Sequence, residues 1–267
     1  MPRSGATIVP RSGATIVPRT CIEYGPEPQQ FGHFYVPEGV GEEPVPVVMV
    51  VHGGFWSGEY HLNLGTPFSV ELAQSGVAVW NVEYRRIGAG GRWPEISADV
   101  VAALEAIAGP VAEASPVPLD LDRVRVVGHS AGGQLAVWLA GQRDTAVRPE
   151  LFVSQAGALD LASAGERGRR ISYIEDLFGV AYGEDPDLYR SASPLHRLPI
   201  GVPVVCIHGT EDEQVPAKIA SRYHDAAHAI GDPVDLHLID GEDHFAFLDP
   251  STRSWKLSRE LLLDSQT

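Results

Sequence analysis

Residues 123–133 read RVRVVGHSAGG, in which a valine-rich run ends at a serine placed between glycines. The run 123–129 has the composition of a buried β-strand, and residues 132–142 carry apolar side chains at helical spacing. A serine in a GHSAG turn between a strand and a helix projects above the edge of a sheet, and the flanking glycines relieve the crowding of that turn. The segment therefore predicts that Ser130 is a nucleophile; the alternative is a glycine-rich turn with an incidental serine.

Strand-like and helix-like stretches alternate along the rest of the chain, which is typical of a sheet covered by helices. Several of the strand-like runs are almost continuously apolar, as parallel strands buried on both faces must be. The expected strands are residues 31–36, 45–52, 77–84, 123–129, 151–157, 202–209 and 234–240, and the expected helices are residues 95–108, 132–142, 217–230 and 254–263. The sequence predicts the α/β class, with a mostly parallel, twisted sheet and helices on both faces.

The domain organisation follows from two irregular segments. The octapeptide RSGATIVP occurs at residues 3–10 and again at residues 11–18, and two such short copies cannot build a repeat fold. We expect residues 1–20 to form a mobile N-terminal arm and residues 21–267 to form a single domain. The stretch 158–201 between two expected strands is too long for a plain connection. It predicts a small cap insertion over one end of the sheet.

Composition excludes several classes of function. Twenty Lys and Arg against thirty-five Asp and Glu give a net charge of -15, the wrong sign for binding nucleic acid. No apolar run is long enough for a membrane span or a secretory signal, so we expect a soluble, cytoplasmic protein with no membrane partner. The only two cysteines, Cys21 and Cys206, rule out a disulfide scaffold. The expected partner is a small molecule, and a homodimer is left open.

A nucleophilic serine needs a histidine to take its proton and an acid to orient that histidine. His244, in GEDHFAF, follows the last expected strand, and Asp212, in HGTEDEQVP, follows the strand expected at 202–209. Both residues would lie at the sheet edge that also holds Ser130. The chain order Ser130, Asp212, His244 is that of the strand–serine–helix elbow and differs from the orders of the chymotrypsin and subtilisin triads.

Other acids and histidines remain alternatives to these two. Asp240 and Asp243 are too close in sequence to His244 to reach around its ring. Glu211, Glu213 and Asp160 stay open as the acid, whereas His52 and His208 are expected to fix neighbouring loops by hydrogen bonds.

The segment HGGFW at residues 52–56 follows another apolar strand and supplies the third part of a site. Attack on a carbonyl places negative charge on oxygen, and backbone N–H groups held in position stabilise that charge. The predicted donors are the N–H groups of Gly54, Phe55 and Ala131. A plain Gly-Gly turn is the alternative.

The motifs HGGFW, GHSAGG, HGTEDEQVP and GEDHF occur in this order, and the chain from about residue 31 to 263 resembles an α/β-hydrolase. Within that superfamily it is similar to kynurenine formamidase (arylformamidase) and to carboxylesterases related to hormone-sensitive lipase. Phe55 replaces the last glycine of the lipase-like HGGG motif, which favours the formamidase branch. The segment NVEYRR at 81–86 also resembles a family segment, in which Arg85 would form a structural ion pair.

The resemblance implies a serine hydrolase without a cofactor that cleaves small carboxylic esters or aryl formamides. Ser130 would attack the acyl carbon, His244 would carry the proton, Asp212 would orient His244, and water would release the acid from the acyl-enzyme. The most specific expectation is an arylformamidase acting on N-formylkynurenine. Aromatic residues expected to line a substrate pocket are Phe55, Trp56, Trp93, Tyr173, Phe178 and Phe245.

Several other functions remain open. A general short-chain carboxylesterase differs only in its pocket, an acyltransferase passes the same acyl group to an alcohol, and a binding protein could use the fold without catalysis. A prolyl-oligopeptidase-type peptidase usually carries a propeller domain for which this chain has no room. No metal or nucleotide is expected, because His224 and His228 lack the glutamate of an HExxH motif and glycines 88–91 do not fit a phosphate loop.

Overall fold

A single eight-stranded sheet organises the computed structural model, which describes residues 17–37, 41–166 and 171–264 of the chain. The strand order is β1-β2-β4-β3-β5-β6-β7-β8; β1 and β2 run antiparallel to their neighbours, and the other adjacent pairs are parallel. The strands are β1 (Arg19–Glu23), β2 (Phe31–Tyr35), β3 (Val45–Val51), β4 (Ala78–Val82), β5 (Leu119–His129), β6 (Leu151–Gln155), β7 (Val204–Gly209) and β8 (Val234–Ile239).

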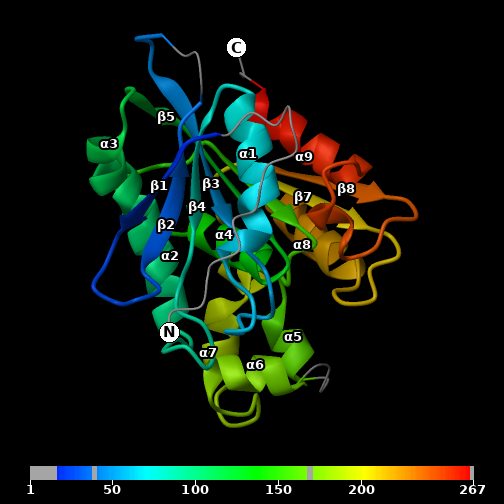
Figure 1. Cartoon of the computed structure of the whole chain (residues 1–267). Helices are drawn as coiled ribbons and strands as arrows, with labels where there is room; N and C mark the ends of the chain where they lie inside the picture. The colour runs from blue at the N-terminus through cyan, green and yellow to red at the C-terminus, as the bar shows by residue number, and fades with distance from the viewer. Residues whose placement is uncertain (1–16, 38–40, 167–170, 265–267) are drawn as a thin grey trace, which may run out of the picture.

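Helices cover both faces of this sheet (Figure 1). Helices α1 (Thr66–Gln74) and α9 (Arg253–Leu263) pack on one face through a core that includes Phe68 and Trp255. Helices α2 (Glu95–Glu105), α3 (Pro110–Ala114), α4 (Ala131–Ala140) and α8 (Lys218–Ala229) contribute to the core on the other face. Burial on both sides explains why β3, β4 and β7 consist almost entirely of buried residues. The predicted α/β fold class is confirmed.

The interval between β6 and β7 folds into α5 (Leu161–Glu166), α6 (Ile171–Phe178) and α7 (Pro186–Ala192), followed by a 3-10 turn at Pro194–Arg197. Figure 1 shows α5, α6 and α7 grouped at one end of the molecule. Trp93, from the loop before α2, joins this group to the body of the protein. Its ring packs edge-on against Trp138, with centroids 5.0 Å apart, and its backbone N–H donates to the Leu177 carbonyl. The segment 158–201 thus contains a helical insertion held by aromatic packing.

The N-terminal boundary differs from the sequence prediction. Strand β1 begins at Arg19, within the segment 1–20 that the sequence assigns to an arm, so residues 19 and 20 belong to the sheet. Most of the duplicated octapeptide lies in residues 1–16, outside the described residues. Strand β1 escapes prediction because it is an edge strand in which only Ile22 is buried, which leaves no alternating pattern.

Within the described part of the chain, none of the helices combines the length and the apolar character that crossing a lipid bilayer requires.

The parallel strands place the carboxyl ends of β5, β7 and β8 at one edge of the sheet. Ser130 follows β5, Asp212 follows β7 and His244 follows β8. Segments up to 114 residues apart in sequence therefore meet at this edge, where open α/β sheets form their ligand sites.

An ion pair between the half-buried Arg85 and the buried Asp99 fixes the region behind this edge. The Arg85 guanidinium donates from Nε to Oδ2 of Asp99 at 2.9 Å and from Nη2 to Oδ1 at 2.7 Å. The Asp99 side chain is fully buried, and Gln30 Nε2 also donates to Oδ1 at 2.7 Å. The pair joins the end of β4 to α2, in agreement with the structural ion pair expected for Arg85.

Replacing Arg85 by Met should lower the free energy of unfolding by about 3 kcal/mol, because it leaves the Asp99 carboxylate buried without its cation. Urea unfolding at neutral pH measures this change. The matched control is Arg190→Met, which breaks the exposed Arg190–Asp187 pair and should leave the free energy of unfolding nearly unchanged. Equal losses in the two variants would contradict the structural role of Arg85.

Candidate active site

Ser130 occupies a strained turn between β5 and α4. Its backbone has φ of 55° and ψ of -115°, which is unusual for a residue with a side chain. The turn is held from both sides, since the Ser130 N–H donates to the Gln155 carbonyl at 2.8 Å and its carbonyl accepts from the Gln134 N–H at 3.0 Å. This geometry presents the hydroxyl at the carboxyl edge of the sheet.

The glycines around Ser130 are required by backbone packing. A Cβ atom on Gly128 would lie 2.1 Å from the Gly132 carbonyl oxygen, and one on Gly132 would lie 2.1 Å from the Val51 carbonyl oxygen. Backbone atoms cannot move aside as a flexible side chain could. The GHSAG sequence therefore allows α4 to start directly against the end of β3.

Ser130, His244 and Asp212 form a continuous hydrogen-bonded chain. His244 Nε2 lies 2.9 Å from Ser130 Oγ, and His244 Nδ1 lies 2.7 Å from Asp212 Oδ2. All three residues are buried. With Nδ1–H donating to the carboxylate, Nε2 faces the serine hydroxyl as an acceptor. The structure thus brings the three predicted residues together in the arrangement of a nucleophile, a base and an orienting acid.

The alternative acid Asp160 is engaged elsewhere. Its buried carboxylate accepts from Arg222 Nη1 at 2.8 Å and from the Ser163 N–H at 3.0 Å. No hydrogen bond in the described chain joins His244 to Asp160, Glu211 or Glu213.

Four donors surround the Asp212 carboxylate. Oδ1 accepts from the N–H groups of Gln214 at 2.8 Å and Val215 at 2.7 Å, and Oδ2 accepts from His208 Nε2 at 3.0 Å as well as from His244. Burial acts to raise the pKa of Asp212, but hydrogen bonds from His208 and His244 outweigh it and hold that pKa well below its ordinary value. Asp212 therefore stays ionised across the neutral range.

His208 contributes to this acid site as well as to its loop. Its Nε2–H is shared between Asp212 and the Val215 carbonyl, which lies 2.7 Å away. The ring is fully buried, and its Nδ1 has no hydrogen-bond partner within the described residues. The sequence identified a loop-fixing histidine but missed its contact with the acid four residues later.

His129, directly before Ser130, is a second residue that sequence reasoning missed. Its Nε2–H donates to the His244 carbonyl at 2.9 Å, which ties the serine turn to the loop that carries the base. Burial, reinforced by the nearby His244, lowers the pKa of His129 to about 3. The ring therefore remains a neutral donor.

The HGGFW loop lies beside Ser130 and has a backbone that bends sharply. Gly54, Phe55 and Trp56 have φ values of 109°, 56° and 55°. His52 fixes the loop, because its Nδ1 contacts the Gly53 carbonyl at 2.7 Å while its Nε2 contacts Glu83 Oε1 at 2.9 Å. In a trans peptide the N–H points away from the carbonyl, so holding the Gly53 carbonyl also sets the direction of the Gly54 N–H.

Two of the three predicted oxyanion donors are available to a ligand. No residue of the described chain accepts a hydrogen bond from the N–H of Gly54 or of Ala131. Both residues flank the site, Gly54 in the bent loop and Ala131 at the first position of α4. Phe55, the third predicted donor, lies in the same loop, and its side chain stacks on Tyr173 with ring centroids 4.7 Å apart.

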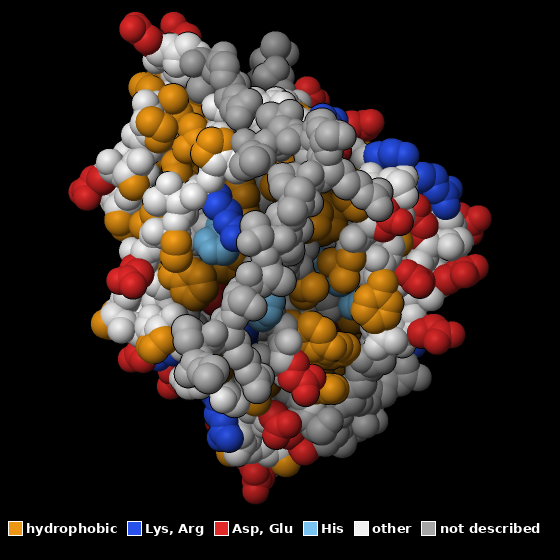
Figure 2. Space-filling view, viewed as in Figure 1, with side chains coloured by type: hydrophobic (Ala, Val, Ile, Leu, Met, Phe, Trp, Pro, Cys, Tyr) orange, Lys and Arg blue, Asp and Glu red, His pale blue; other side chains and the backbone are white. Residues whose placement is uncertain are grey.

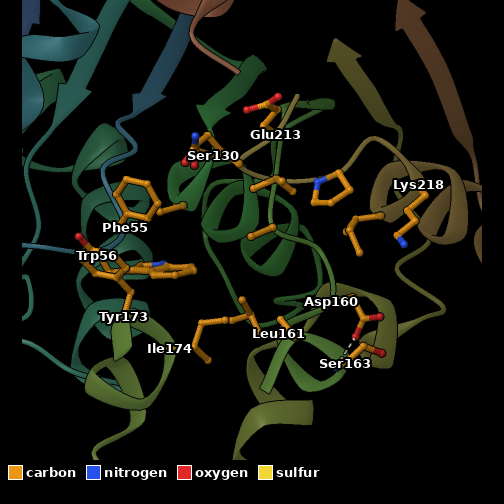
Figure 3. A pocket seen from close by; sticks show the side chains of 17 residues that line it. Phe55, Trp56, Ser130, Asp160, Leu161, Ser163, Tyr173, Ile174, Glu213 and Lys218 are labelled. Atoms are coloured by element: carbon orange, nitrogen blue, oxygen red, sulfur yellow. Dashed lines mark hydrogen bonds between the residues drawn. The ribbon is translucent and has the colours of Figure 1, made fainter. Parts of the chain in front are cut away.

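A cavity of about 330 Å³ opens onto Ser130 between the body and the helical insertion (Figure 3). Phe55, Trp56 and Tyr173 line one side of it, so three of the six predicted pocket residues do face the cavity. Trp56 is fixed by a hydrogen bond from its Nε1 to Gln134 Oε1 at 3.0 Å.

The other three predicted pocket residues do not line this cavity. Trp93 packs against Trp138 in the body, and Phe178 packs on Tyr189 within the insertion, with ring centroids 4.0 Å apart. Trp93 and Phe178 also contact each other edge-on, with centroids 6.5 Å apart, and so join the insertion to the body. Phe245 is 53% exposed and lies edge-on to the His244 ring. The sequence marks all three as aromatic residues near the site, but the side that each faces depends on tertiary packing.

A mostly parallel sheet, a serine turn after β5 and a hydrogen-bonded Ser–His–Asp chain at the carboxyl edge define an α/β-hydrolase with the site of a serine hydrolase. The chain also matches the BD-FAE family over residues 33–226, most of its length. The protein belongs to the BD-FAE family. The predicted resemblance to the α/β-hydrolase superfamily is confirmed, whereas the resemblance to kynurenine formamidase stays a prediction.

Two of the relatives are esterases by name. The chain is 27% identical over 225 residues to esterase LipC of Mycobacterium tuberculosis, covering 78% of this chain and 55% of LipC. It is 27% identical over 244 residues to isoprenylcysteine alpha-carbonyl methylesterase ICME of Arabidopsis thaliana, covering 84% and 55%. The chain thus spans about half the length of these two relatives. A truncated carbohydrate esterase from gut microbiota has a similar fold, with a TM-score of 0.75, 18% identity, and 91% and 94% of the two chains covered.

Replacing His208 by Leu should lower kcat for hydrolysis about tenfold and leave KM within about twofold, because Asp212 loses a donor that holds its carboxylate in position toward His244. His208→Gln, which keeps an N–H donor, should retain most of kcat. Steady-state kinetics of both variants test this. Equal losses in the two variants, or a loss confined to KM, would show that His208 only fills space.

Acid should destabilise the protein partly through His129. Its pKa is about 3 in the folded protein and near 6.5 in an unfolded chain, so below pH 6.5 the unfolded chain binds a proton that the folded protein rejects. The stability gained from keeping His129 neutral is therefore lost as pH falls, by about 2 kcal/mol between pH 7 and pH 5.

The variant His129→Gln keeps a donor but cannot titrate, so its unfolding free energy should fall by about 2 kcal/mol less over the same interval. Urea unfolding at pH 7 and pH 5 measures the difference. His228→Gln, which removes an exposed histidine on α8, is the matched control and should behave like the wild type. An unchanged pH dependence in His129→Gln would contradict the buried, neutral ring.

Proposed function

We propose that this protein is a serine hydrolase that cleaves small carboxylic esters through an acyl-enzyme. The observation that carries the proposal is the hydrogen-bonded chain from Ser130 through His244 to Asp212, beside two N–H groups that no described residue engages. A cavity of about 330 Å³ at the serine suits a small substrate. The esterase names of LipC, ICME and the gut carbohydrate esterase support an ester as the substrate class.

The geometry leads to a two-step reaction. His244 Nε2 takes the proton as Ser130 Oγ attacks the acyl carbon, and the Asp212 carboxylate stabilises the imidazolium that forms. The N–H groups of Gly54 and Ala131 donate hydrogen bonds to the carbonyl oxygen as it becomes negatively charged, and each contributes about 3 kcal/mol to transition-state stabilisation. His244 then gives its proton to the departing alcohol. Water attacks the acyl-enzyme by the same steps in reverse and releases the acid.

A narrower form of the proposal is hydrolysis of an aryl formamide such as N-formylkynurenine. The stacked rings of Phe55 and Tyr173 at the cavity wall offer a flat apolar surface for an aryl group. A formyl group is also the smallest acyl group that the site would have to hold. This preference is separate from the ester hydrolysis proposed above and has its own measurement.

Hydrolysis of 4-nitrophenyl acetate and of N-formylkynurenine should be measured side by side. Ser130→Ala should lower kcat at least about 10³-fold with an unchanged unfolding midpoint, because it removes the nucleophile and little packing. Asp212→Asn should also lower kcat strongly, whereas Asp160→Asn should have a much smaller effect, since Asp160 pairs with Arg222. A crippling effect of Asp160→Asn alone would overturn the assignment of the acid.

A fluorophosphonate probe separates an enzyme from a binding protein on the same fold. Mass spectrometry should find one adduct on Ser130 in the folded wild type and none in Ser130→Ala. Absence of labelling, together with no turnover of either substrate, would refute the proposed function. Ester turnover without formamide turnover would reject only the narrower form.

A further inference from the structure

The cavity at Ser130 has two chemically different sides. Figure 3 shows Phe55, Trp56 and Tyr173 on one side, and Asp160, Ser163 and Lys218 on the opposite side. A substrate whose scissile carbonyl meets Ser130 can extend one arm toward each side. The residues on the polar side therefore influence which substrates bind at the site.

On the polar side of the cavity, the groups that can still form hydrogen bonds with a ligand are donors. Asp160 is fully buried and already satisfied, because Oδ2 accepts from Arg222 Nη1 at 2.8 Å and Oδ1 accepts from the Ser163 N–H at 3.0 Å. The Ser163 hydroxyl oxygen accepts from Arg222 at 3.5 Å, which leaves its O–H free to donate. Arg222 thus balances the charge of Asp160 and donates to both Asp160 Oδ2 and the Ser163 hydroxyl oxygen.

Lys218 adds an ammonium group to this side. It makes no ion pair with any carboxylate of the described residues, and it is one of only two lysines in the chain. Lys218 is also the first residue of α8, where a cation opposes the helix dipole. Helix stability therefore gives no reason for a lysine at this position, whereas the cavity does.

Glu213, the other carboxylate at the cavity, adds a negative charge away from Lys218. Glu213 lies on the Ser130 side in Figure 3, away from Lys218, and forms no ion pair within the described residues. A negatively charged substrate group is repelled near Glu213 and attracted near Lys218. The two charges favour one direction for an anionic arm.

We propose that Lys218 and Ser163 form a carboxylate-binding subsite, so that the preferred substrate carries an aryl group on one side of the scissile carbonyl and a free carboxylate on the other. The ammonium and the hydroxyl donate to the carboxylate, while Phe55 and Tyr173 hold the aryl ring. This assignment rests on the proposed ester hydrolysis and narrows its substrate class.

Two esters that differ at a single terminal group test the subsite. The mono-4-nitrophenyl ester of adipic acid and 4-nitrophenyl hexanoate share the aryl group and a six-carbon acyl chain, which ends in a carboxylate in one and in a methyl group in the other. The measured quantity is the ratio of kcat/KM for the adipate ester to kcat/KM for the hexanoate ester.

Lys218→Met should lower this ratio about five- to tenfold, the size expected for a charged contact that remains partly open to water. Its kcat/KM for the hexanoate ester should stay within about twofold of the wild type. Lys218→Arg, which keeps the charge, should retain at least half of the wild-type ratio. Added salt should reduce the wild-type ratio toward that of Lys218→Met.

Lys256→Met is the matched control, because it removes the other lysine, which is exposed on α9, and changes the net charge by the same amount. Its ratio should stay within about twofold of the wild type. An equal fall in both variants would mean that overall charge, and not the cavity, selects the acid.

The possible failures are distinguishable. An adipate-to-hexanoate ratio that is the same in the wild type and in Lys218→Met, with both esters hydrolysed, overturns the subsite and leaves the hydrolase intact. No turnover of 4-nitrophenyl hexanoate above that of Ser130→Ala refutes the hydrolase itself. Thermal unfolding of Lys218→Met should match the wild type, so that a changed ratio reports on binding.

Discussion

The close contact between the start of α4 and the end of β3 is the constraint on which the rest of the site depends. Gly132 packs directly on the Val51 carbonyl, so the serine turn and the HGGFW loop that follows β3 take their positions from the same contact. The Ser130 N–H is bonded to the last residue of β6 on the other side. The nucleophile and its oxyanion donors thus belong to one packed unit of backbone. The strained backbone conformation of Ser130 persists because the packed neighbours leave no room for another conformation.

Three buried histidines at the ends of β3, β5 and β7 orient the parts around this unit. His52, His129 and His208 contact the carbonyls of Gly53, His244 and Val215, respectively. Each therefore fixes one loop of the site: the oxyanion loop, the base loop and the acid loop. Burial keeps these contacts out of competition with water, and the low pKa of His129 shows the cost of charging such a ring. The positions of the reacting groups thus depend on these three histidines as well as on the triad itself.

The sequence predicted the central strands and the triad residues because both follow from local rules. Apolar runs mark strands buried on two faces, and the order of Ser130, Asp212 and His244 after successive strands places them at one edge. Strand β1 was missed because an edge strand with one buried residue has no periodic signal. The pocket prediction failed for Trp93 and Phe178 for a related reason: composition indicates that an aromatic residue is buried, but not against which element. The place of Lys218 in the cavity depends on how α8 meets the insertion, which no local pattern contains.

The same packing determines how the site can select a substrate. Phe178 lies on Tyr189 within the insertion, and Trp93 of the body contacts Phe178 edge-on and donates its backbone N–H to the Leu177 carbonyl. Buried aromatic rings thus anchor the insertion that closes the cavity. The side of the cavity that Tyr173 and Ile174 line therefore takes its position from this core. A stacked aromatic wall on one side and an ammonium group on the other then suffice to rank substrates, while the Ser130 chemistry stays the same for all of them.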